Sequence, residues 1–169
     1  MIGAALYNAS VDLLNAAVAA LDAHSSLGAP ERRSVSVGDP ALDCDQVTVA
    51  AAARVAAAPV TGRGTDTYTQ QSRPRVIAAD FRVLVVRCGY PSVAADGSAP
   101  PDTEIEAASA ALYEDGWALF IGLSDGARSG TITLSGAAAG WEVASLEPVG
   151  AEGAVAGWLV RCSATLRSV

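Results

Sequence analysis

Few side chains in this sequence can do acid–base chemistry. The chain has 169 residues and one histidine, and its 11 lysine and arginine residues are all arginine. Histidine and lysine are common general acids and bases of enzymes, and beyond these the sequence shows no convergent set of polar residues for a catalytic centre. The one histidine, His24, ends a predicted helix, where a cationic side chain suits the helix dipole, and we interpret it as a surface residue. We therefore predict a non-catalytic protein.

Two groups of acidic residues could in principle bind a metal or cleave a glycosidic bond. Asp39, Asp43 and Asp45 lie close together, but the spaced ligands and closing glutamate of a calcium loop are missing. We predict that these aspartates stabilise turns. Glu114 and Asp115 are neighbours on a predicted helix, and we interpret them as a solvated acidic face because nothing indicates a sugar cleft. Neither group predicts a metal or cofactor site.

The cysteines and the glycine-rich segment also predict little chemistry. Cys44, Cys88 and Cys162 are odd in number and form no CxxC pair. A disulfide framework or a zinc site is therefore not expected, and we interpret all three as buried free thiols, which fits synthesis in the cytosol. The segment 62–64, Gly-Arg-Gly, lacks the pattern of a phosphate-binding loop, and no lysine is present to complete one.

Composition limits the class of protein. The net charge is −7 and hydrophobic residues make up 51% of the chain, which favours a folded domain with a substantial core. Binding of nucleic acid needs clustered cations, whereas an acidic protein can enclose DNA without holding it. The start of the chain lacks a positively charged leader region. Since no run of about 18 uninterrupted apolar residues occurs, we expect neither a signal peptide nor a membrane span.

Hydrophobic periodicity predicts the elements that would position any site. An apolar stripe at three- and four-residue spacing predicts a helix over 8–24, and Pro101 followed by acidic residues opens a second helix over 102–123. The strand at 75–89 has apolar residues at both its odd and its even positions, so both of its faces are apolar, which is typical of a central strand. Alternation and β-branched runs predict strands at 33–37, 45–57, 75–89, 131–134, 141–146 and 154–166.

The order of elements predicts the fold class. Helix, strands, helix and strands indicate one domain over 1–169 of the α+β class, with two helices packed on one face of a mostly antiparallel sheet. Residues 58–74 lack apolar periodicity and join two long strands, so we predict a long hairpin arm that reaches outward. The three tryptophans, Trp117, Trp141 and Trp158, are predicted to anchor the core.

Several stretches together carry a resemblance to a known family. They are VDLLNAAVAALDAH, PERRSVSVGDPALDCDQVTVAA, RCGYP, PPDTEIEAASAAL leading to DGWALFIGL, and GWLVRCSATL. The sequence resembles the tail terminator and head-to-tail connector proteins of long-tailed (siphovirus-type) phages that infect actinobacteria, over nearly the whole chain. The alanine-rich, lysine-free composition suggests a GC-rich genome, which agrees with such a host.

The resemblance implies a structural role in the virion. Tail terminators form a hexameric ring at the head-proximal end of the tail tube, end its polymerisation and join the tail to the head connector. The implied partners are further copies of the chain, the tail tube protein and the connector or stopper protein, with DNA passing through the lumen without specific binding. The implied location is the neck of the virion, assembled in the host cytoplasm, with no membrane, cofactor or catalytic residue.

Within the predicted arm, Arg63, Tyr68 and Arg73 are candidates for contacts with a neighbouring subunit or the tube; the competing interpretation is an ordinary surface loop. Three other functions stay open at this point. A head-completion (stopper) protein differs from a terminator mainly in its position, and a tail tube subunit would polymerise without stopping. A small ligand-binding or hydrolytic domain would need a deep pocket with a perturbed titratable group.

Overall fold

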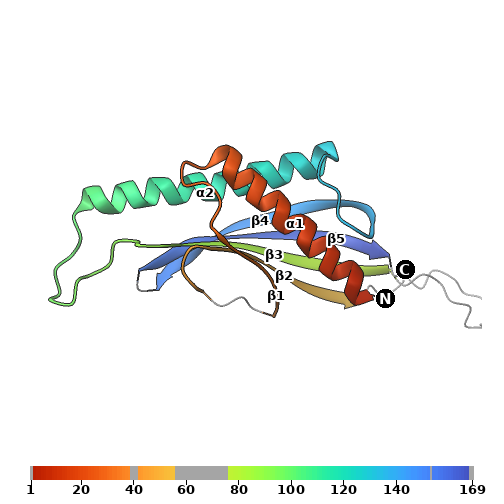
Figure 1. The fold of residues 1–169 in the computed structure, drawn as a ribbon, viewed down its shortest axis with the longest axis horizontal. Helices are drawn as coiled ribbons and strands as arrows, with labels where there is room; N and C mark the ends of the chain where they lie inside the picture. The colour runs from red at the N-terminus through yellow and green to blue at the C-terminus, as the bar shows by residue number, and fades with distance from the viewer. Residues whose placement is uncertain (1, 39–41, 56–75, 153, 168–169) are drawn as a thin grey trace, which may run out of the picture.

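The computed structural model describes residues 2–38, 42–55, 76–152 and 154–167 (Figure 1). Two helices and five strands follow one another as α1 (Ile2–His24), β1 (Arg32–Val37), β2 (Gln46–Val55), β3 (Val76–Cys88), α2 (Asp102–Ser129), β4 (Ala137–Glu152) and β5 (Val155–Arg167). The strands form one sheet in the order β1-β2-β3-β5-β4, and both helices lie on the same face of it (Figure 1). The predicted α+β class is confirmed.

The sheet is mostly antiparallel, as predicted. β1 runs parallel to β2, and every other neighbouring pair is antiparallel. β2 and β3 pair up to Val55 opposite Ile77, so they form a hairpin around residues 56–75. The predicted arm, with Arg63, Tyr68 and Arg73, lies outside the described residues.

The core lies between the helices and the sheet. α1 contributes Leu13 and Leu21, and the central strand β3 contributes Phe81 and Val83, all fully buried. β3 is also buried on its other face, where Leu84 is 3% exposed. The central position that was predicted from the apolar residues on both faces of this strand is confirmed.

α1 is unusually apolar for a helix on the surface of a domain. The stretch Gly3–His24 is long and apolar enough to cross a membrane by length and composition, although no membrane span was expected from the sequence. Its inner side belongs to the core through Ala9, Leu13 and Ala17. Its exposed positions include Ala19, a residue of high helix propensity. Packing and propensity therefore account for this composition.

Two predicted boundaries in the second half of the chain are wrong. α2 does not end near Leu123 but continues to Ser129, where Gly130 in the left-handed conformation (φ 71°) closes it. The segment 131–134, predicted as a strand, is irregular. Ile132 packs against Gly126 so closely that a Cβ at position 126 would lie 2.0 Å from its Cδ1. That glycine therefore fits the helix because a neighbour takes the place of its side chain, and it does not mark a helix end.

β4 is also longer than predicted. The turn expected at 148–153 is strand as far as Glu152, and Pro148 lies within it. β4 pairs only with β5 and forms one edge of the sheet, where a missing backbone donor can face solvent. The register with β5 shifts at three points, which indicates bulges along this edge.

Candidate functional site

The residues that the sequence suggested for chemistry do not converge. His24 is exposed at the end of α1, as predicted. Asp43 forms an ion pair of 2.6 Å with Arg32 and accepts a hydrogen bond from the Cys44 N–H, and Asp45 accepts one from the Cys88 N–H. These bonds are the turn chemistry predicted for the two aspartates; Asp39 lies outside the described residues. Within the described part of the chain, no three His, Cys, Asp or Glu residues are grouped to hold a metal.

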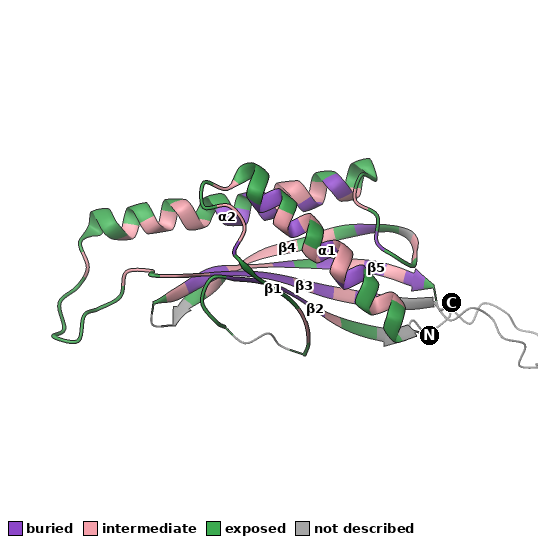
Figure 2. Ribbon diagram, viewed as in Figure 1, coloured by how far each residue is buried: buried purple, intermediate pink, exposed green. Residues whose placement is uncertain are grey.

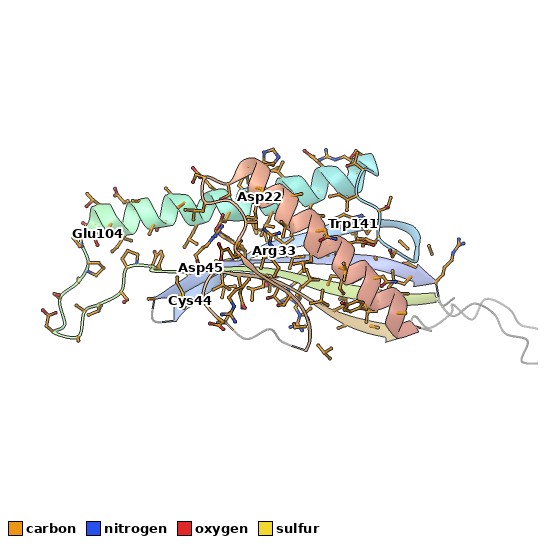
Figure 3. All side chains as sticks on the ribbon, viewed as in Figure 1. Asp22, Arg33, Cys44, Asp45, Glu104 and Trp141 are labelled. Atoms are coloured by element: carbon orange, nitrogen blue, oxygen red, sulfur yellow. A yellow bond between two sulfur atoms is a disulfide. The ribbon has the colours of Figure 1, made fainter. Side chains whose placement is uncertain are left out.

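The prediction of three free thiols is wrong for two of them. Cys44 and Cys88 form a disulfide with a Cα–Cα distance of 5.1 Å. The antiparallel register explains it. Gln46 pairs with Val86, so Cys44, two residues before Gln46, lies opposite Cys88, two residues after Val86. The third thiol, Cys162, is buried as predicted, and burial raises its pKa to about 12. Cys44 and Asp45 lie side by side in Figure 3.

The interpretation of Glu114 and Asp115 as a solvated acidic pair is wrong for Asp115. Its side chain is fully buried and faces Arg87 of β3, with Nε 2.7 Å from Oδ2 and Nη2 3.1 Å from Oδ1. The Ser25 hydroxyl donates to the same carboxylate at 2.5 Å, and Arg87 also donates to the Gly28 carbonyl. This cluster joins β3, α2 and the segment that follows α1.

Glu114 belongs to the same junction from the exposed side. Its carboxylate accepts hydrogen bonds from the backbone N–H and the hydroxyl of Ser26, and these bonds lower the pKa of Glu114. Consecutive carboxylates of α2 therefore hold the segment between α1 and β1 in place. The geometry saturates these side chains with structural partners, which is the arrangement of a fixed junction and not of an acid–base pair open to a substrate.

An aromatic ridge runs along the exposed side of α2. We define it as Tyr113, Trp117 and Phe120. Tyr113 is 66% exposed and Trp117 64%, and the rings of Trp117 and Phe120 stack at 6.3 Å. The prediction that Trp117 anchors the core is thus wrong, whereas Trp141 is 7% exposed and belongs to the core. The outer side of α2 is largely exposed in Figure 2.

Trp158 supports the ridge from below. It lies half-buried on β5, donates a hydrogen bond of 2.5 Å from Nε1 to the Leu112 carbonyl and contacts the Tyr113 ring at 5.5 Å. α2 can approach the Trp158 ring closely because residue 116 is a glycine. A Cβ at this position would lie 2.7 Å from Trp158 Cδ2. The predicted anchoring role therefore holds for Trp158, which fixes α2 on the sheet and the ridge beside it.

The ridge faces the β4 side of the molecule. Glu114 reaches back toward Ser26 at the end of α1, whereas Tyr113 leans on β5, the neighbour of β4. α1 packs mainly over β1 and β2, at the other edge of the sheet. At that other edge Val37 is fully exposed and Leu42 is 42% exposed. The fold thus carries exposed apolar side chains near both edges of the sheet, on two different surfaces.

Comparison with known proteins adds no assignment to this geometry: no protein-family model and no curated protein matches the chain. The class that the fold itself defines is a two-layer α+β protein, with a helical layer on one face of a mixed sheet.

Proposed function

We propose that this protein is a non-catalytic structural subunit that assembles into a ring, and that the ring is the tail terminator of a long-tailed phage. The observation that carries self-assembly is the aromatic ridge on the β4 side together with the exposed Val37 on the β1 edge. The assignment to a phage tail depends on the sequence resemblance. In this role the ring ends the tail tube, contacts the tube protein and the head connector, and lets DNA pass.

Two different contact surfaces at opposite edges favour a ring. A patch that binds its own equivalent gives a closed dimer, whereas two different patches join copies head to tail. A head-to-tail contact that closes by rotation makes a ring, and one that does not close makes a filament. The ridge lies by β5 and β4, and Val37 lies on β1, the opposite edge strand. When two copies dock in this way, one copy keeps a free ridge and the other keeps a free β1 edge, so further copies can add until the ring closes.

The ridge has the residue types that dominate binding energy at protein interfaces. Tryptophan and tyrosine are enriched at such positions, and each buries roughly 200 Å². With about two thirds of each side chain exposed, burying Tyr113 and Trp117 removes roughly 250 Å² from water, worth about 6 kcal/mol before the cost of association. A stable interface needs on the order of 1,000 Å², so the ridge would anchor a larger contact.

The ionisable groups support a structural role. The carboxylates of Asp43, Glu114, Asp115 and Glu147 each bind an arginine, a serine or a backbone N–H of the fold. The net charge of −7 favours a lumen through which DNA slides without being held. Two cavities bear on the ligand-binding alternative. The one of about 210 Å³ beside Tyr113 and Trp158 is smaller than typical ligand sites, whereas one of about 700 Å³ beside Arg32 and Asp45 has the size of such a site and is the better support.

The test is the assembly state of the purified chain. Light scattering across a concentration series gives the mass, and negative-stain images of the same samples give the shape. Discrete rings are expected from a terminator or from the neighbouring stopper position in the neck. Open-ended tubes would assign the chain to the tube itself. A monomer at every concentration would contradict self-assembly and direct attention to the ligand-binding alternative, first to the cavity of about 700 Å³.

A further inference from the structure

The Cys44–Cys88 disulfide lies at the surface of the molecule. Cys44 is exposed and Cys88 half-buried, while Cys162 is buried within the core. A cavity of about 700 Å³, lined in part by Arg32, Asp45 and both cysteines, opens beside the bond. Exchange of a disulfide requires a thiolate to reach one of its sulfurs, and access is one of the factors that set the rate. A small thiol can therefore reach this bond in the folded protein.

The disulfide holds one segment in place. Residues 42–45 lead into β2, and Cys44 fastens this segment to Cys88, the last residue of β3. The other described ties at this point are polar. Asp43 pairs with Arg32 while both side chains are more than half exposed, and Asp45 accepts one bond of 3.3 Å from the Cys88 N–H. Exposed ion pairs contribute little stability, so the disulfide is the strongest of these ties.

The packing of the rest of the fold does not include this bond. The core cluster includes neither Cys44 nor Cys88. The neighbouring Arg87 is held by its own pair with buried Asp115, and β2 is bonded to β3 along its described length. β1 pairs only with β2 and forms an edge of the sheet. Opening the disulfide should thus loosen residues 42–45 and the β1 edge, while the helices and the inner strands stay folded.

We propose that Cys44–Cys88 is a reversible thiol–disulfide exchange site for small thiols, and that its redox state controls the order of residues 42–45 and β1. A thiolate of the glutathione class attacks the exposed Cys44 sulfur, forms a mixed disulfide and releases Cys88, which takes up a proton. A second thiolate attacks the sulfur of the small molecule, releases Cys44 as a thiol and leaves the small-molecule disulfide. That disulfide, as the oxidant, reverses both steps.

The site therefore responds to its compartment. A reducing cytosol keeps the pair as a dithiol with a loose β1 edge, and an oxidising surrounding closes the bond and fixes the edge. This inference is independent of ring assembly, because it depends only on the accessibility of one bond and on the segment which that bond fastens.

The test counts reactive thiols in the native protein. The oxidised chain is treated with reduced glutathione at millimolar concentration, and the thiols are then labelled with a maleimide that shifts the mass on a gel. Two labels are expected in the native state and the third only after denaturation, since Cys162 is buried. Oxidised glutathione should return the count to none. On reduction, hydrogen exchange should become faster chiefly in residues 42–45 and β1, and change much less in α2 and β5.

Variants make the outcome decisive. Cys44→Ser and Cys88→Ser should each show the loose exchange pattern without any reductant. Their unfolding temperature should be lower by roughly 10 °C, from the loop that the bond closes. Cys162→Ala, the control, should keep the full redox response. A native disulfide that resists millimolar thiol would overturn the proposal. So would labelling of Cys162 at the same rate as the pair, because that result means global unfolding.

Discussion

Replacing Asp115 by alanine should destabilise the protein strongly. The carboxylate is fully buried and forms two hydrogen bonds with Arg87, whose side chain is only 12% exposed. The substitution leaves a guanidinium with little access to water and without its anion, and the Ser25 hydroxyl loses its acceptor. Removing one partner of a buried pair typically costs about 3–5 kcal/mol. At about 2 kcal/mol per molar urea, the unfolding midpoint should fall by roughly 2 M.

The matched control is an ion pair of similar geometry at the surface. Arg161 Nε lies 2.8 Å from Glu147 Oε1, but the two side chains are 49% and 43% exposed. Glu147→Ala should therefore move the urea midpoint only slightly, since exposed ion pairs contribute little stability. Urea unfolding followed by circular dichroism measures both variants. Equal, small losses for Asp115→Ala and Glu147→Ala would refute the reasoning, because they would show that Asp115 is as solvated as the sequence alone suggested.

Three further outcomes follow from single contacts. Gly116→Ala should destabilise by about 1–3 kcal/mol and change the tryptophan fluorescence, because the new Cβ meets the Trp158 ring at 2.7 Å. Cys162 should stay unreactive toward a thiol reagent at pH 8 until urea unfolds the chain, since burial holds its pKa at about 12. Hydrogen bonds from Ser26 lower the pKa of Glu114 below 4.5, so its contribution is present above that pH and is lost as the pH falls through the folded pKa. The urea midpoint should accordingly be lower at about pH 3 than at about pH 6, and Glu114→Gln should reduce the difference.

The main elements of the fold could be predicted because they depend on local patterns. β5 was identified by its alternating apolar and polar residues, and β3 by apolar residues on both of its faces. The order of helices and strands identified the fold class. The length of α2 could not be predicted in this way. Gly126 resembles a helix stop in the sequence, and only its contact with Ile132 shows why the helix continues.

The misinterpreted polar residues and cysteines depend on contacts between distant parts of the chain. Asp115 and Arg87 are 28 residues apart, and their pairing follows from the packing of α2 on the sheet. The disulfide had a signal that was available: once β2 and β3 pair as a hairpin, Cys44 and Cys88 fall opposite each other. Trp117 was expected inside because tryptophans usually are, yet Gly116 places the neighbouring Trp158 under the helix and leaves Trp117 outside.

The measurement that tests self-assembly through the ridge most directly compares particle mass between two variants. In the double variant Tyr113→Ser with Trp117→Ser, both exposed ridge aromatics are removed. The control Val93→Ser removes an apolar side chain of equal exposure, 64%, from the segment between β3 and α2. We expect the wild type and the control to form rings of the same mass, and the double variant to be a folded monomer. Rings of unchanged mass from the double variant would contradict this account.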